Sequence, residues 1–93
     1  MNADLMLDER HVLSERAFVE MVVWRVDPPV SGSHHTFKYR LALVVDGQCV
    51  LRYDNETGKG DHKHMGKKEI PYIFTTSQKL LDDFWKDVES WRT

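Results

Sequence analysis

The segment FKYRLALVVDGQCVLRYD, residues 37–54, decides the fold of this chain. In residues 37–45 large apolar side chains alternate with charged or smaller ones, which is typical of a strand with one face on a core. Asp46-Gly47 is a strong hairpin signal, because both residue types accept the backbone conformation that a tight turn requires. Residues 48–54 then form the antiparallel partner strand. We therefore predict a β-hairpin at the centre of the fold.

Two registers of this hairpin remain open. A two-residue loop pairs Arg40 with Tyr53, whereas a three-residue loop pairs Arg40 with Asp54 and puts Cys49 on the apolar face as a small core residue. Turn chemistry favours the first register and hydrophobic patterning favours the second. In either register Arg40 lies beside the polar run that ends at Asn55.

The residues before the hairpin predict two further strands. Residues 17–26, AFVEMVVWRV, are rich in β-branched and aromatic side chains, and their nearly continuous apolar character favours a central position in a sheet. Residues 3–12 alternate loosely between apolar and polar, which indicates a strand with one solvated face. The polar residues 14–16 fit the turn between these strands, and Pro28 and Pro29 follow the end of the second one.

The C-terminal residues predict a short edge strand and a helix. Residues 69–74 contain Pro71, which cannot donate to a neighbouring strand. Thr75 and Gln78 match a capping box, so we expect Thr75 to be the N-cap of a helix that runs to about Trp91. Its apolar residues form one stripe at helical spacing: Leu80, Leu81, Phe84, Val88 and Trp91. The prediction is an α+β fold: residues 1–93 form one domain, an antiparallel sheet of about five strands with a C-terminal helix packed on one face.

Composition limits the classes of function. The net charge of −2 argues against a chain that binds nucleic acid over its whole surface, although four lysines gather at positions 59, 63, 67 and 68. No apolar run approaches the roughly 20 residues of a membrane helix, and the acidic N-terminus lacks a secretory signal. The single cysteine allows no internal disulfide. We therefore predict a cytoplasmic protein without a membrane partner.

The segment RYDNETGKGDHKHMG, residues 52–66, holds the chemistry and is predicted to be the active loop. His62 and His64 point to the same side if the backbone is extended, and histidine titrates near neutral pH, so the pair suits acid and base roles. A metal site needs three or four protein ligands. Asp61, Asp54 and a distant His34 or His35 are candidates for the remaining ligands, but no second pair has ligand spacing. We therefore expect no metal and no cofactor. The alternative is that both histidines are ordinary solvent-exposed loop residues.

Seven further candidates surround the histidine pair: Lys38, Arg40, Arg52, Tyr53, Asn55, Lys59 and Asp61. Lys59 stands between two glycines and, like Arg40, is predicted to hold a phosphate. Asp61 is predicted to orient a histidine, while the others are predicted to contact a nucleotide. The alternatives are salt bridges for the arginines and core packing for the tyrosine. Histidines and cations around one groove are the groups that cut RNA without a metal.

Several short motifs together resemble one family, the TumE-like toxins: KYR at 38–40, YDNE at 53–56, GKGDHKH at 58–64, PYIF at 71–74 and FWKD at 84–87. The resemblance spans nearly the whole chain. It implies the toxin half of a bacterial type II toxin–antitoxin module. It also implies a partner, a small antitoxin with a helix-turn-helix DNA-binding domain. The family implies no catalytic assignment, so the ribonuclease interpretation comes from the residues alone.

The sequence thus predicts a toxin that acts as a metal-independent endoribonuclease, with RNA as its substrate. One alternative is a binding protein that blocks a protein or nucleic-acid target without chemistry. Another is an ATP-dependent nucleotidyl- or phosphotransferase, which needs a carboxylate–metal pair, and only Asp54 and Asp61 are suitably placed for one. The sequence leaves open which RNA is cut and whether the chain forms a homodimer.

Overall fold

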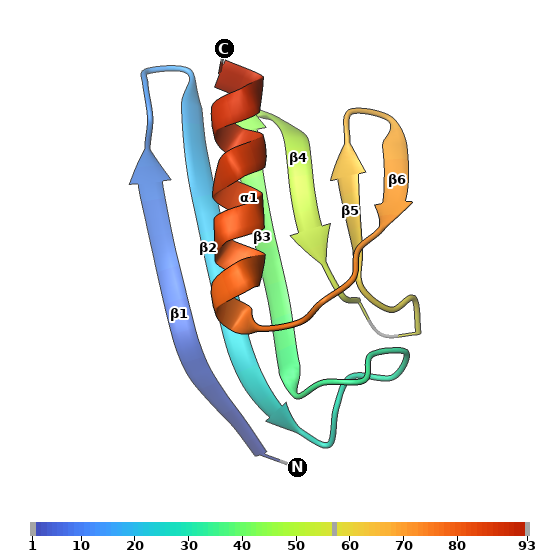
Figure 1. The fold of residues 1–93 in the computed structure, drawn as a ribbon. Coiled ribbons are helices and arrows are strands. Elements are labelled where there is room, and N and C mark those ends of the chain that lie inside the picture. Colours follow the sequence, from blue (N-terminus) through green and yellow to red (C-terminus); the bar gives the residue numbers. More distant parts are fainter. Residues whose placement is uncertain (1, 57, 93) are drawn as a thin grey trace.

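The fold is a two-layer arrangement of one antiparallel sheet and one helix (Figure 1). The structure is a computed structural model and describes residues 2–56 and 58–92. The strands follow one another across the sheet in chain order: β1 (Asn2–Val12), β2 (Ala17–Asp27), β3 (Phe37–Val45), β4 (Gln48–Asp54), β5 (His62–Met65) and β6 (Lys68–Pro71). The helix α1 (Ser77–Arg92) packs on one face. The predicted α+β class is confirmed, with six strands rather than five.

The central hairpin of β3 and β4 combines the two predicted registers. Asp46 and Gly47 have positive φ angles of 51° and 78°, as a two-residue turn requires, and pairing begins directly beside them. Val50 is then the extra residue of a β-bulge, because the partners of Leu43 and Val44 are two residues apart in β4. Beyond the bulge Arg40 pairs with Asp54. Turn chemistry therefore fixes one end of the hairpin and hydrophobic patterning fixes the other.

The same bulge explains why Cys49 lies outside the core. The prediction that Cys49 is a buried residue was wrong, because its side chain is exposed. Cys49 precedes the bulge, and the extra residue Val50 reverses which positions of β4 face the helix. These two side chains point toward the helix, and Cys49 points to the other face.

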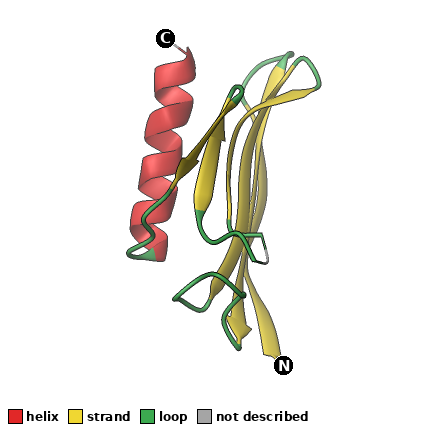
Figure 2. Cartoon of the chain, turned by 90° about the vertical axis from the view of Figure 1, so that its right-hand side faces the viewer, coloured by secondary structure: helices red, strands yellow, loops and turns green. Residues whose placement is uncertain are grey.

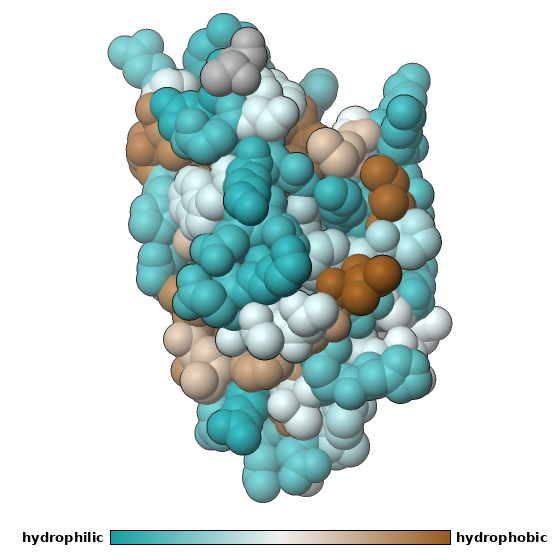
Figure 3. Space-filling view, viewed as in Figure 1, coloured by the Kyte–Doolittle hydropathy of each residue, from teal (hydrophilic) through white to brown (hydrophobic). Residues whose placement is uncertain are grey.

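The core fills the space between the sheet and α1. In the middle of β2, β3 and β4 every second residue points toward the helix and is buried, and the helix contributes residues four positions apart. The members are Val19, Met21, Val23, Tyr39, Leu41, Leu43, Leu51, Tyr53, Leu80, Phe84 and Val88. The outward side of α1 is mainly hydrophilic (Figure 3). No described element covers the opposite face of the sheet (Figure 2), which we call the open face.

The helix begins one residue later than predicted. The hydroxyl of Thr76 accepts a hydrogen bond from the Lys79 backbone N–H at 3.1 Å, and the Thr76 carbonyl accepts one from Leu80. Thr76 is therefore the N-cap, and the predicted capping box starting at Thr75 was wrong by one position. Gln78 donates to Asp82 on the helix surface instead of closing a box.

The segment predicted as a loop contains a strand. His62–Met65 pairs with β4 on one side and with β6 on the other, so the second half of the predicted loop is extended sheet. The hairpin of β5 and β6 leans toward the helix side of the sheet (Figure 2). As predicted from Pro71, β6 is an edge strand.

Candidate functional site

The open face carries a polar cluster built in register from three strands. Arg40, Asp54 and His62 are cross-strand neighbours in one row across β3, β4 and β5. Arg52 and His64 are neighbours in the next row. Because residues two apart in a strand point to the same face, both rows lie on the same side of the sheet. We call these five residues the open-face cluster.

His62 is held from both sides of its ring. Its Nδ1 lies 3.0 Å from the carbonyl oxygen of Gly60, which only accepts, so Nδ1 carries a proton. Its Nε2 lies 2.7 Å from Oδ1 of Asp54. This distance is within ion-pair range, although the direction of the contact is not that of a hydrogen bond. The ring is nearly buried, with 4% exposure.

Three buried polar atoms in this cluster lack a hydrogen-bond partner among the described residues: Arg52 Nε, Asp54 Oδ1 and His64 Nε2. Arg52 Nε lies 2.9 Å from Asp54 Oδ2, and Asp54 Oδ1 lies 2.7 Å from His62 Nε2, but the directions are not those of hydrogen bonds. The rings of His62 and His64 meet edge to face with centres 4.9 Å apart. Each buried polar group without a hydrogen-bond partner lowers folding stability by about 1–3 kcal/mol. Such groups are kept where a bound ligand supplies the missing hydrogen bond.

The cluster also contains a set of atoms that suits a metal ion. Possible ligand atoms of Asp54, His62 and His64 all lie within 4.8 Å of one another. Two imidazoles and one carboxylate are a donor set of catalytic zinc and non-haem iron sites, and the bond from His62 to Gly60 is the kind that orients such a ligand. The sequence offered Asp54 only as one of several candidates for a further ligand, because the strand pairing that brings it beside the histidines is not visible in residue spacing.

A positively charged hollow adjoins the cluster. It has a volume of about 290 Å³ and is lined by Lys38, Tyr39, Arg40, Arg52, Asp54, Asn55 and Glu56. Lys38 and Arg40 are exposed on β3, and Arg52 is partly buried beside Asp54. The structure therefore brings three predicted cations together with the two histidines.

Asp61 lies apart from this cluster. Its carboxylate accepts hydrogen bonds from the Tyr39 hydroxyl at 2.7 Å, from His35 Nε2 at 2.7 Å and from the Ser33 hydroxyl at 2.8 Å. Burial, reinforced by the bond to Asp61, raises the pKa of Tyr39. The histidine that Asp61 contacts is thus His35, which stacks on Phe74 with ring centres 3.7 Å apart.

Tyr53 and Asn55 are built into the scaffold. Tyr53 is 1% exposed beneath the helix, where its hydroxyl donates to Asp87, and burial raises its pKa. Asn55 is also 1% exposed and closes the end of β3, since its oxygen accepts from the Tyr39 N–H at 3.0 Å and its amide donates to the Phe37 carbonyl at 2.7 Å. Tyr53 therefore points away from the open-face cluster, whereas Asn55 lines the hollow beside it.

Lys59 lies in the exposed loop between β4 and β5. This loop packs on the loop between β2 and β3: the Gly58 N–H donates to the Ser31 carbonyl at 2.7 Å. At Gly32, with a φ angle of 95°, an added Cβ would lie only 2.8 Å from the backbone nitrogen of Gly60. Close backbone packing therefore holds the loop that leads into His62.

Sequence reasoning named Asp54 only as a possible metal ligand, and it did not place Glu69 in the site. Asp54 is the direct partner of His62, and Oε1 of Glu69 lies 3.9 Å from the same ring. The three-residue register already placed Asp54 beside Arg40, and this was the available signal for Asp54. Glu69 follows only from the pairing of β5 with β6, which requires β5 to be recognised as a strand.

Comparison with known proteins identifies the family. Among the described residues no helix is both long and apolar enough to cross a membrane. Neither a curated protein nor a solved structure is significantly similar to the chain. The family model described as Toxin TumE matches residues 2–92, which is nearly the whole chain. The chain therefore belongs to the TumE toxin family.

Proposed function

We propose that this toxin is an endoribonuclease that cuts RNA at the open-face cluster without a metal. The observation that carries the proposal is the arrangement of His62 against Asp54, with His64 beside it and its Nε2 lacking a hydrogen-bond partner among the described residues. Two neighbouring imidazoles, one against a carboxylate and one with a ring nitrogen that has no partner in the described part of the chain, can share the two roles of general acid–base catalysis.

The proposed reaction assigns one role to each histidine. His64 takes the proton of a ribose 2′-hydroxyl, and the resulting oxygen attacks the adjacent phosphorus. The bond from phosphorus to the 5′-oxygen of the next nucleotide then breaks, and His62 gives its proton to that oxygen. The products are a 2′,3′-cyclic phosphate and a free 5′-hydroxyl. Asp54, whose Oδ1 lies 2.7 Å from His62 Nε2, holds the His62 ring in place for this proton transfer.

The cations supply electrostatic stabilisation. Negative charge grows on the phosphoryl oxygens in the transition state, and preorganised positive groups lower its energy. Arg40 lies in the same cross-strand row as His62, and Arg52 lies beside His64. Lys38 adds a positive charge two residues before Arg40 on β3. Lys59 adds charge at the loop before β5. In this proposal Asp61, Tyr53 and Asn55 hold the ends of the strands in place.

A second candidate is metal-assisted cleavage at the same cluster. It is favoured by the ligand atoms of Asp54, His62 and His64, which lie within 4.8 Å of one another. A bound divalent ion would supply an activated water and a Lewis acid. The two candidates share the same residues but differ in their response to a chelator.

Membership of a toxin family implies an antitoxin partner. We propose that this partner carries a helix-turn-helix DNA-binding domain and meets the toxin in the cytoplasm, where the RNA substrate is. Neutralisation then requires the antitoxin to block the open face or to prevent RNA from reaching it.

The test is incubation of the purified protein with total RNA, with and without EDTA. The double variant His62→Ala, His64→Ala and the control His34→Ala, at an exposed loop histidine, are run beside it. We expect cleavage in EDTA, 2′,3′-cyclic phosphate ends, a loss of at least about 100-fold in the double variant, and no loss in the control. Cleavage that EDTA abolishes would favour the metal-assisted candidate.

Absence of cleavage in every lane would refute both candidates. The remaining readings would then be a protein that blocks its target without chemistry, or an ATP-dependent transferase. Adding ATP and magnesium to the same RNA separates these two, because only the transferase would modify the RNA ends.

A further inference from the structure

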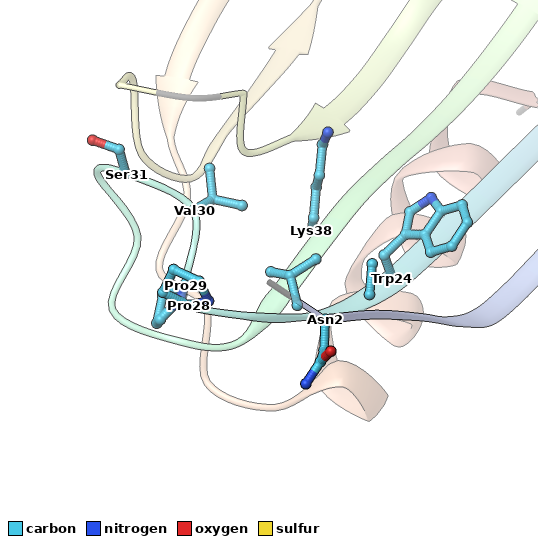
Figure 4. A pocket seen from close by; sticks show the side chains of 9 residues that line it. Asn2, Trp24, Pro28, Pro29, Val30, Ser31 and Lys38 are labelled. Carbon is cyan, nitrogen blue, oxygen red and sulfur yellow. The ribbon is translucent and has the colours of Figure 1, made fainter.

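The open face contains a second, apolar hollow at the far end of β2 (Figure 4). Its volume is about 410 Å³, within the range of small-molecule sites. Apolar side chains and the stem of a lysine form much of its wall: Trp24, Val26, Pro28, Pro29, Val30 and Lys38. Trp24 is only partly buried. A tryptophan at the wall of an open apolar hollow, on a face that no described element covers, indicates a binding surface.

This hollow is continuous with the positively charged one. Lys38 lines both hollows, because it is the cross-strand partner of Trp24 and precedes Arg40 by two residues on the same face of β3. Lys38 and Arg40 form no ion pair with any described residue. A ligand that occupies both hollows therefore has a flat or apolar part next to a negatively charged part.

We propose that the hollow at Trp24 binds a base of single-stranded RNA whose phosphates lie on Lys38 and Arg40. This inference rests on the proposed function, because the bound base belongs to the RNA strand that the histidines cut. Bases stack on aromatic side chains, and each stacked base contributes about 1–3 kcal/mol. Asn2 and Ser31 at the edge of the hollow offer an amide and a hydroxyl to the polar edge of a base.

The spacing of the strands places this base away from the cut. Trp24 lies on β2 and His62 on β5, so three strand spacings of about 4.8 Å, roughly 14 Å in all, separate their backbones. The stacked base therefore belongs to a nucleotide further along the strand than the one whose 2′-hydroxyl reacts. Binding there defines the path of the RNA across the sheet, which runs from β2 over Lys38 and Arg40 to the histidines.

The test uses an oligonucleotide that cannot be cut. A short 2′-O-methyl RNA lacks the reacting hydroxyl, so its affinity is independent of catalysis. We expect Trp24→Ala to weaken binding by about fivefold to a hundredfold, and Trp24→Phe to restore most of it. Trp91→Ala, at an exposed position on the helix, should bind as the parent does. Circular dichroism of each variant reports whether it is folded.

An oligonucleotide series with one base removed at a time identifies the stacked nucleotide. At one position, loss of the base should weaken binding to the parent but not to Trp24→Ala. The proposal is overturned if folded Trp24→Ala binds the oligonucleotide as the parent does. It is also overturned if the substitution weakens binding of a fully abasic strand as much as binding of the normal strand. Loss of antitoxin binding without loss of oligonucleotide binding would also overturn it and indicate a protein docking surface.

The outcome is separable from that of the proposed function. If the protein cuts no RNA but Trp24→Ala still loses base-dependent binding, the subsite stands and the catalytic proposal fails. If the protein cuts RNA and Trp24→Ala binds normally, the catalytic proposal stands and the subsite fails.

Discussion

Replacing Tyr53 by Phe tests whether this residue belongs to the scaffold or to the RNA-binding surface. The sequence placed Tyr53 at the nucleotide, whereas its ring lies on the helix side of the sheet with 1% exposure. The hydroxyl donates to Asp87 Oδ2 and lies 3.3 Å from the carbonyl oxygen of Asp83. Tyr53→Phe should therefore lower stability and leave RNA cleavage by the folded protein unchanged.

The size of the effect follows from the partners of Asp87. A hydrogen bond to a charged group contributes about 1.5–3 kcal/mol to stability. Asp87 keeps a second partner, since Lys63 Nζ lies at 3.2 Å, and its side chain is 22% exposed, so water replaces part of the lost bond. We therefore expect the lower end, about 1.5 kcal/mol. In a domain of this size that is a fall in Tm of about 6–12 °C.

Urea denaturation and RNA cleavage on the same preparation provide the measurement. Asp87→Asn is the matched partner variant, and the double variant should lose less than the sum of the single losses because the two groups interact. The reasoning is refuted if Tyr53→Phe unfolds at the same urea concentration as the parent but no longer cuts or binds RNA. Tyr53 would then contact the nucleotide, as the sequence suggested.

Two further predictions concern pH and the glycine loops. Three tyrosine hydroxyls bond to carboxylates, and burial raises the pKa of all three: Tyr39, Tyr53 and Tyr72. Their stabilisation is complete below the ordinary pKa of about 10 and is lost as pH rises toward the folded-state values, by up to about 1.4 kcal/mol per pH unit for each. Urea midpoints should fall steeply above this pH and less steeply in Tyr72→Phe; parallel curves would contradict this. Gly32→Ala should destabilise more than Gly47→Ala, because an added Cβ meets the backbone of Gly60 at 2.8 Å in the first and nothing within 4 Å in the second. Equal losses of stability in thermal melts would show that the loop of Gly32 does not pack on the loop of Gly60 as described.

The sequence was informative where one pattern dominated. The strands from residues 17 to 54 were predicted to within a residue, because β-branched and aromatic residues alternate there between clear turns. The strand β5 was not predicted, because His-Lys-His has the composition of a polar loop. Its backbone is extended because it pairs with β4 on one side and β6 on the other, and such pairing is not visible in local composition.

The candidate site was only partly predictable for the same reason. His62, His64 and the cations of β3 and β4 were found by residue type, since few other chemistries use them together. The contact between Asp54 and His62 depends on the register of a strand that was read as a loop. Trp24 was read as part of a central apolar strand, but within residues 2–56 and 58–92 a helix covers one face of the sheet and leaves the other open. The packing of α1 determines which face is covered, and the residues of β2 alone do not reveal it.

The bulge at Val50 has a consequence for how the chain can change length. Removing this one residue would leave a regular hairpin in which Leu51 still faces the helix and Asp54 still lies opposite Arg40. Removing any single residue from 51 to 54 would instead turn part of β4 over and exchange core side chains with site side chains. Relatives that are one residue shorter in this hairpin are therefore expected to lack the residue at position 50. Site and core thus both survive a deletion at this one point of the strand.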